Sequence, residues 1–240
     1  MFCLKTINGL FYFEKGKIMI YLDKYKKEQF KNVYFITGTA TGGKTTISKA
    51  LAEKYGWLRY DVDEEFDRHK SLSNSKDNPA MNKTFKNADE FFMRDVNEYE
   101  KWLKDNTREQ LPFVLDDIIK LSKKQKVVCD LHLLVEEAEQ IADKNQVVFL
   151  IRENNENIID DYCHRKSHEG FNRFINSATN PEAAKQNCNT VLRKINVERC
   201  NDIRNSDFFW IARNEKSTIE KTLRLVEEFF GLIKTENKAP

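Results

Sequence analysis

Short apolar runs alternate with stretches of helical periodicity along most of the chain. The apolar runs are rich in β-branched and aromatic residues and predict strands at residues 33–36, 57–61, 126–131, 147–151 and 208–212. Apolar positions three and four apart predict helices at residues 44–55, 89–104, 112–124 and 133–144, with a last helix after Ser217. Strands that alternate with helices predict an α/β protein, with a five-stranded parallel sheet covered by helices on both faces.

The ends of two predicted helices carry recognisable signals. Gly56 follows the first helix, at the position where a glycine commonly ends one by adopting a left-handed conformation. Ser217 stands three residues before Glu220, which predicts a capping box at the start of the last helix.

Two long inserts interrupt the alternation, at about residues 64–125 and 154–205. The first begins with a polar segment at 70–90, which predicts an exposed connection. Excursions of this length in a compact domain commonly carry function. We predict one domain at residues 31–240, preceded by an N-terminal extension at 1–30. That extension is a short strand pair, an added helix or an excess of translated sequence.

The most specific motif lies between the first predicted strand and the first predicted helix. Gly38, four further residues, and then Gly43, Lys44 and Thr45 match the phosphate-binding P-loop pattern. A strand, a glycine-rich loop and a helix are the context in which that pattern binds phosphate. The predicted nucleotide-binding residues are therefore Gly38, Thr39, Ala40, Thr41, Gly42, Gly43, Lys44, Thr45 and Thr46.

The chemistry of this loop follows from its residue types. Glycines let the backbone bend tightly, so that its amides point inward at the positive end of a helix and bind anions. Lys44 is predicted to reach the β- and γ-phosphates of ATP, and the Thr45 hydroxyl to bind Mg²⁺.

The composition narrows the classes of partner. Of 240 residues 40% are hydrophobic and 32% charged, and the net charge is only +2, which gives no support to a strongly basic nucleic-acid surface. No apolar run approaches the roughly 20 residues of a membrane span. The five cysteines form no C-x-x-C pair and predict free thiols in a reducing cytoplasm. We therefore expect a cytoplasmic protein that binds small molecules rather than nucleic acid or membrane.

Three aspartates follow predicted strands. Asp61 and Asp63 end the second strand, two residues apart, so that on an extended segment their side chains point the same way. Asp130 ends the third strand. Ligands of parallel α/β sheets bind beyond the carboxyl ends of the strands, which is where these carboxylates are expected. Asp61 and Asp130 are predicted to hold the water shell of Mg²⁺, and Asp63 to orient an acceptor hydroxyl. The alternative is that Asp63 and Asp130 cap the helices that follow them.

Together these motifs resemble the nucleoside-monophosphate kinase and shikimate kinase group over about residues 31–234. The segment 61–66, Asp-Val-Asp-Glu-Glu-Phe, is similar to the D-x-D of shikimate kinases, and 90–94 is similar to their E-x-x-F-R with Met93 in place of Phe. The glycine triplet of their third-strand loop is absent from 128–132, so shikimate is not the expected acceptor. The resemblance implies a three-layer P-loop fold with strand order 2-3-1-4-5, a helical acceptor insert, a mobile lid and ATP as donor.

Arginines in the two inserts complete the predicted site. Arg94 is predicted to clamp an anionic acceptor, because a guanidinium binds carboxylate or phosphate in a bidentate way. Arg165 lies in the predicted lid with Lys166 and Arg173, where arginines in this group stabilise the moving phosphoryl group. Arg152, after the fourth strand, is expected to be structural.

Two further clusters have simpler interpretations. The lid also holds Cys163, His164, His168 and Cys188, but their spacing matches no zinc template. Phe91, Phe92 and Trp102 are expected to be packing residues.

The sequence therefore predicts an ATP-dependent small-molecule kinase that uses Mg²⁺, with Lys44, Asp63 and Arg165 as catalytic residues and Arg94, Asp61 and Asp63 at the acceptor. Three alternatives stay open: a nucleoside or nucleotide kinase, a phosphotransferase that modifies antibiotics or peptidoglycan precursors, and a nucleotide-binding regulatory module without transfer activity. The absence of an N-K-x-D motif makes a GTPase less favoured. Neither the acceptor nor the oligomeric state is readable from the sequence.

Overall fold

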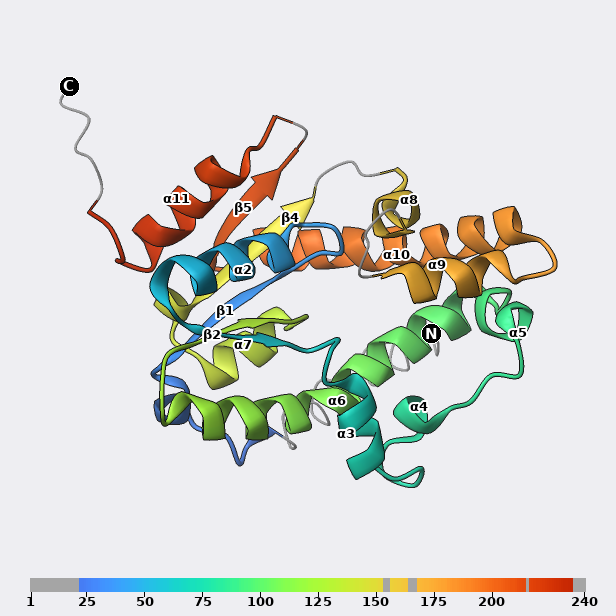
Figure 1. The fold of residues 1–240 in the computed structure, drawn as a ribbon, viewed down its shortest axis with the longest axis horizontal. Coiled ribbons are helices and arrows are strands. Elements are labelled where there is room, and N and C mark those ends of the chain that lie inside the picture. The colour runs from blue at the N-terminus through green and yellow to red at the C-terminus, as the bar shows by residue number, and fades with distance from the viewer. Residues whose placement is uncertain (1–21, 153–155, 164–167, 215, 235–240) are drawn as a thin grey trace, which may run out of the picture.

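The computed structural model describes residues 22–152, 156–163, 168–214 and 216–234. Five parallel strands form one sheet in the order β2-β3-β1-β4-β5, which confirms the predicted topology (Figure 1). The strands are β1 Val33–Gly38, β2 Leu58–Asp61, β3 Val127–Asp130, β4 Val147–Arg152 and β5 Phe209–Arg213.

Helices surround the sheet and extend beyond it. The longer ones are α2 Lys44–Tyr55, α6 Val96–Ser122, α10 Pro181–Arg204 and α11 Ile219–Phe229. The shorter ones are η1 Lys27–Phe30, α3 Phe66–Leu72, α4 Pro79–Asn82, α5 Ala88–Phe92, α7 Val135–Ile141, η2 Lys144–Gln146, α8 Ile158–Cys163 and α9 Glu169–Asn176. Within the described part of the chain, no helix is both long and apolar enough to cross a membrane.

Alternate side chains of the buried strands supply two hydrophobic cores, one on each face of the sheet. Helices α6, α7 and α10 cover one face, and their apolar side chains pack against Val33, Phe35 and Phe149. Helices α2 and α11 cover the other face and pack against Ile36 and Val148. Apolar residues at both odd and even strand positions are the pattern of a sheet buried on both sides, and they produce the three layers seen here.

The register of the strands fixes which residues meet at their carboxyl ends. Asp61 at the end of β2 pairs with Asp130 at the end of β3, and Asp130 also pairs with Ile36 of β1. On the other side of β1, Arg152 at the end of β4 pairs with Arg213 at the end of β5. The loop after β1 therefore lies between two aspartates, at the ends of β2 and β3, and two arginines, at the ends of β4 and β5.

Helices α6 and α10 run past this edge of the sheet, and α5 and α9 pack near their far ends (Figure 1). A third hydrophobic cluster fills that region and includes Phe92, Tyr99 and Cys188. The first insert and the described part of the second insert thus share a core of their own.

The first insert differs from the prediction in where its helices begin and end. The separate helices predicted at 89–104 and 112–124 are one continuous helix, α6, with Pro112 inside it. Proline removes only one hydrogen bond, and the apolar side chains on both sides of Pro112 hold the helix in place. The helix begins at Val96 because the Asp95 side chain accepts hydrogen bonds from the first free amides. The segment predicted as an exposed connection includes α4 and the end of α3.

Two other element ends also differ. The last helix is capped by Thr218 rather than Ser217, whose hydroxyl accepts from the Asn214 amide instead, so the predicted capping box is wrong. Helix α7 is shorter than predicted because the chain before it is tied to β1, where the Leu133 amide donates to Thr37 Oγ1 (2.9 Å). Leu22, Tyr25 and Phe30, which belong to the predicted N-terminal extension, are buried in the same hydrophobic cluster as Val33 and Phe35.

A glycine at the start of the loop after β1 is required sterically. A Cβ on Gly38 would lie 2.1 Å from the carbonyl oxygen of Leu150, and the φ of Gly38, 126°, is one that residues with a side chain rarely adopt.

We expect Gly38→Ala to lower the free energy of unfolding by about 3 kcal/mol, measured by urea denaturation. The matched control is Gly170→Ala in α9, where a Cβ would meet no other atom. Because alanine favours the helix over glycine, this variant should have a free energy of unfolding about 0.5 kcal/mol higher than the wild type. Equal stabilities of the two variants would contradict this steric account.

Candidate active site

The loop between β1 and α2 is a compact turn pressed against β4. The Thr39 amide donates to the Leu150 carbonyl (3.1 Å), and the Thr39 hydroxyl accepts from the Arg152 amide (2.9 Å). Thr41 has a left-handed φ of 57°, which is uncommon for a β-branched residue, and Gly43 has a φ of 90°. These turns let the chain reverse at once into α2, whose first free amides face the loop.

Lys44 lies inside the curve of this loop. Its side chain is only 8% exposed, and its Nζ donates to the Thr39 carbonyl (2.9 Å). A buried ammonium held by a loop carbonyl is a fixed positive charge at the N-terminus of α2, where anions are favoured. Arg152, expected to be structural, holds the loop through its backbone amide.

Asp130 lies close to Lys44, and Asp61 lies beside Asp130 in the sheet. Asp130 is buried at the end of β3, and burial raises its pKa, while Lys44 and a hydrogen bond from Thr45 lower it. Asp130 does not cap α7, which begins five residues later with Leu134 as its N-cap. Asp61 stands beside it in the sheet and accepts from the Asp63 amide (3.1 Å).

Asp63 completes the group from the loop after β2. Asp63 as a residue is exposed, yet the surrounding protein removes part of the hydration of its carboxylate, which raises its pKa. Repulsion from Asp61 and Asp130 raises the pKa further, whereas Lys44 and His168 lower it. Asp63 does not cap the next helix, because the N-cap of α3 is Glu65. His168, the N-cap of α9 in the predicted lid, therefore acts electrostatically on this group.

The oxygen atoms of this group suit a magnesium ion. Thr45, Asp130 and Asp61 offer a hydroxyl and two carboxylates, which are the ligands that Mg²⁺ prefers. Burial raises the pKa of Asp130 by removing water from its carboxylate, and a divalent cation would offset that cost of keeping it charged. These residues would hold the ion directly or through its waters, and the ion would neutralise charge on the phosphates of a bound nucleotide.

Arg59 is a member of this site that sequence reasoning missed. Its guanidinium pairs with Asp61, lies 4.0 Å from Asp130 Oδ2 and donates through Nε to Ser48 Oγ (3.3 Å). A cation on the same strand therefore partly balances the two carboxylates. The available signal was strand periodicity, since residues 59 and 61 lie on one face of β2.

A buried hydrogen-bond network holds the Asp61–Asp63 segment from behind. Gln110 Nε2 donates to the carbonyl of Val62 (3.0 Å) and lies 3.2 Å from His69 Nδ1. His69 Nε2 lies 2.9 Å from Asp117 Oδ2, which also accepts from Tyr60 (2.8 Å). Since a carbonyl only accepts, the Gln110 amide donates to both partners, and His69 carries its proton on Nε2. No sequence motif marks this network.

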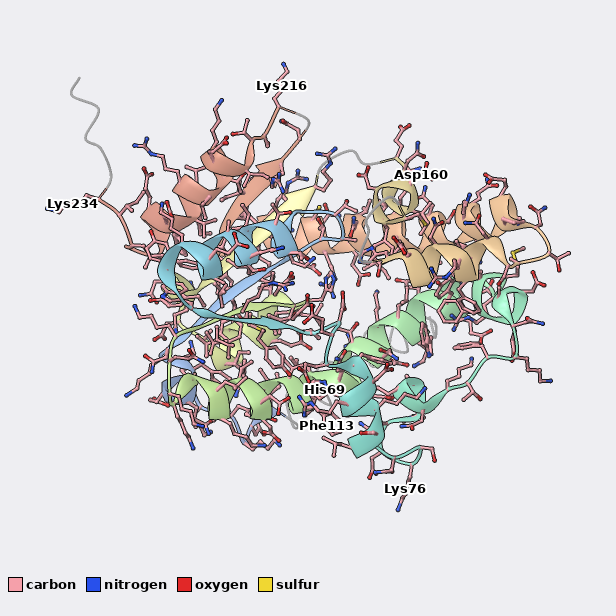
Figure 2. The ribbon with its side chains drawn as sticks, in the orientation of Figure 1. His69, Lys76, Phe113, Asp160, Lys216 and Lys234 are labelled. Atoms are coloured by element: carbon pink, nitrogen blue, oxygen red, sulfur yellow. The ribbon has the colours of Figure 1, made fainter. Side chains whose placement is uncertain are left out.

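Figure 2 shows His69 with Phe113, on which its ring stacks, where α3 meets α6. Together with Glu65 and Asp117, His69 forms a group whose ligand atoms are close enough to hold a metal ion. Arg68, however, pairs with both carboxylates of that group. The cluster is therefore a closed hydrogen-bond network that joins the helices rather than a second metal site.

Two further side chains that the sequence did not single out lie against the loop. Arg213 Nη1 donates to the Gly42 carbonyl (3.1 Å) and occupies the space that a Cβ on Gly43 would need. Burial, and then the neighbouring Arg152, lower the pKa of Arg213. On the other side, His132 Nδ1 lies 3.2 Å from the Gly38 carbonyl. His132 stands where the absent glycine triplet would be.

Arg94 lies in a different environment from the other predicted site residues. Its guanidinium carbon is 4.2 to 5.0 Å from the centres of four aromatic rings, those of Phe85, Phe91, Tyr99 and Trp102. Its Nε donates to the Phe91 carbonyl, and Nη1 and Nη2 are buried without a hydrogen-bond partner in the described protein. Burial lowers its pKa. None of these contacts involves the loop or the three aspartates.

The remaining predictions for the inserts have mixed outcomes. Arg165, Lys166 and His164 lie outside the described residues. Phe91, Phe92 and Trp102 pack in the aromatic cluster, as expected. Among the described residues, the cysteines and histidine of the lid are not grouped as metal ligands: His168 lies 2.9 Å from the Tyr162 carbonyl, and Cys188 contacts Tyr99.

In comparisons with known proteins, this chain is similar to solved structures in its fold alone. No protein-family model matches the chain, and no curated protein matches it. Solved structures that match include the shikimate kinase from Acinetobacter baumannii in complex with shikimate, with 17% identity over 88% of this chain and 99% of that one, and a TM-score of 0.46. The dephospho-CoA kinase from Campylobacter jejuni has 16% identity over 83% and 98%, and a TM-score of 0.43.

A third match is the deoxyadenosine kinase from M. mycoides with bound dCTP, with 13% identity over 84% of this chain and 100% of that one, and a TM-score of 0.36. At identities of 13–17% and TM-scores of 0.36–0.46, the activity of this chain has to be inferred from its own residues.

The raised pKa of Asp130 makes a testable link between the site and stability. Between the ordinary aspartate pKa, about 3.9, and the raised value, the folded protein binds a proton more readily than the unfolded chain, so stability falls as pH rises through that range. In Asp130→Asn no carboxylate has to be kept charged at this buried position, so this loss of stability with rising pH disappears. We expect its Tm at pH 7 with EDTA and no nucleotide to exceed that of the wild type by about 2–4 °C, and the gain to vanish near pH 4.

The control for this measurement is Asp207→Asn, at a side chain that is 87% exposed. A lower Tm for Asp130→Asn at pH 7 would show that its pairing with Lys44 and Arg59 outweighs its burial.

Proposed function

We propose that this chain transfers the γ-phosphoryl group of ATP to a hydroxyl group of a small molecule, with Mg²⁺. The observation that carries the proposal is the meeting of Lys44 and Thr45, on a phosphate-binding loop, with the carboxylates of Asp61, Asp63 and Asp130. A site that only held a phosphate would not need three carboxylates beside it, because they repel the ligand. With a divalent cation between them the repulsion becomes attraction, which is the usual arrangement for phosphoryl transfer.

Each group has a distinct role in this proposal. The amides of residues 38–46 and the Lys44 ammonium hold the β- and γ-phosphates, while Thr45, Asp130 and Asp61 hold Mg²⁺. Asp63 is the most exposed residue of the three aspartates, so it accepts a hydrogen bond from the acceptor hydroxyl and takes up its proton. Bond-making then needs alignment and charge neutralisation more than covalent participation by the protein.

Two arginines of the inserts complete the proposed site. Arg165, in the lid, stabilises charge on the transferred group. Arg94 remains a candidate for binding an anionic part of the acceptor, because two of its nitrogens are buried without a hydrogen-bond partner in the described protein. An acceptor that reaches both Asp63 and Arg94 has to extend from the loop into the aromatic cluster.

The test is a screen of ATP consumption with Mg²⁺ over nucleosides, nucleotides, sugars, hydroxy acids and aminoglycosides. We expect one class of acceptor to raise turnover, and Lys44→Ala to reduce that turnover by at least about 100-fold through loss of phosphate charge stabilisation. Lys49→Ala, at an exposed lysine on the same helix, is the control. Turnover that survives Lys44→Ala would refute the assignment of the loop.

The pattern of the screen also separates the alternatives. Stimulation by nucleosides or nucleotides identifies a nucleotide-metabolising kinase, and stimulation by aminoglycosides identifies an antibiotic-modifying phosphotransferase. Tight ATP binding with no stimulation by any acceptor supports the regulatory module instead.

The proposed role of Asp63 predicts a separate variant. We expect Asp63→Asn to lower turnover with the stimulating acceptor by about 100-fold while the Kd for ATP changes little, because the amide cannot accept the proton. The wild-type turnover should fall on the acid side at a pH above the ordinary aspartate range, in line with the raised pKa of Asp63. Asp67→Asn, at an exposed residue of α3, is the matched control. Loss of ATP binding in Asp63→Asn would assign this carboxylate to the donor instead.

A further inference from the structure

An asparagine in the middle of α10 is bound to the phosphate loop through both ends of its amide. Asn196 is 6% exposed. Its Oδ1 accepts from the Ala40 amide (2.9 Å), and its Nδ2 donates to the Ala40 carbonyl (3.3 Å). Ala40 is the third residue of the loop, so a residue more than 150 positions away in sequence fixes the peptide groups on both of its sides.

The same helix makes a second contact one turn further on. Arg199 Nη1 donates to the Gly38 carbonyl (3.4 Å) and lies 3.3 Å from His132 Nδ1. Residues three apart lie on one face of a helix, so α10 holds the loop at two points, Gly38 and Ala40. The loop is thus supported by β4 on one side and by α10 on the other.

The chemistry at this position is specific to a carboxamide. Ala40 presents one donor and one acceptor, and only Asn or Gln offers an acceptor and a donor in the matching arrangement. An aliphatic side chain would leave both groups of Ala40 unsatisfied in a part-buried position. The next residue, Thr41, holds a left-handed φ of 57°, which persists only where neighbouring contacts impose it.

We propose that Asn196 is a positioning residue for the phosphate loop: by holding Ala40 it keeps Thr41 in its left-handed turn and aims the following amides at the ligand. The structural part of this inference stands without any assumed reaction. Its effect on ATP rests on the proposed function. Because the first turns of α10 pack against α8 and α9, Asn196 also connects the lid region to the loop.

The first experiment needs no ligand. Amide hydrogen exchange of the segment containing residues 38–43 is compared in wild type, Asn196→Leu and Asn201→Leu. Asn201 is exposed on the same helix and serves as the matched control. We expect about ten-fold faster exchange in this segment for Asn196→Leu alone, since the bond to the Ala40 amide is lost. Unchanged exchange overturns the proposal.

The second experiment measures the Kd of ATP and of AMP for the same proteins with Mg²⁺. We expect Asn196→Leu to weaken ATP binding by about ten-fold and to leave AMP binding unchanged, because the loop holds the β- and γ-phosphates that AMP lacks. An equal loss for both nucleotides indicates general damage to the fold and overturns the proposal, as does wild-type affinity for ATP. If Asn196→Leu does not fold, Asn196→Asp replaces it: the carboxylate has the same size and cannot donate to the Ala40 carbonyl, so the same loss of ATP binding is expected.

The two experiments separate the inference from the proposed function. A wild-type protein that binds no ATP refutes the proposed function, and hydrogen exchange alone then decides whether Asn196 positions the loop. A protein that binds ATP with the expected dependence on Asn196 but phosphorylates no acceptor leaves the positioning role intact.

Discussion

The site depends on holding three carboxylates together at the carboxyl ends of β2 and β3. Asp61 and Asp130 are neighbours across parallel strands, so their separation is set by the sheet and cannot relax. Lys44 and Arg59 lower the pKa of Asp130, but burial, together with repulsion from Asp61, keeps that pKa raised. The buried sheet and its two cores supply the rigidity that keeps this unfavourable arrangement intact.

Much of this arrangement could be predicted from the sequence because it is encoded locally. The strand pattern, Gly56 and the phosphate-loop motif each involve neighbouring residues, and the alternation of strands and helices leaves few topologies. The three aspartates were also predictable, because the rule that ligands bind beyond the strand ends applies to any parallel sheet.

The parts that could not be predicted depend on contacts between distant residues. Gln110 and Asn196 look like ordinary polar positions on long amphipathic helices, yet each donates to a backbone carbonyl of the site. A local sequence similarity predicted that Arg94 binds the acceptor. In the structure its position is set by the aromatic side chains around it. A local sequence pattern identifies the phosphate loop. The contacts that fix its conformation come from helices that are distant in the sequence.

The strand order has a consequence for how the protein is made. The central strand β1 pairs with β3 and β4, whose partner residues follow about 90 to 110 positions later in the chain. While a ribosome is still synthesising the first insert, β1 therefore has neither of its neighbours, and its apolar side chains have no finished core to enter. The phosphate loop is encoded near the beginning of the chain, but its shape is acquired late, after β4 and α10 have emerged. A truncated product that carries the complete motif would lack the contacts that shape it.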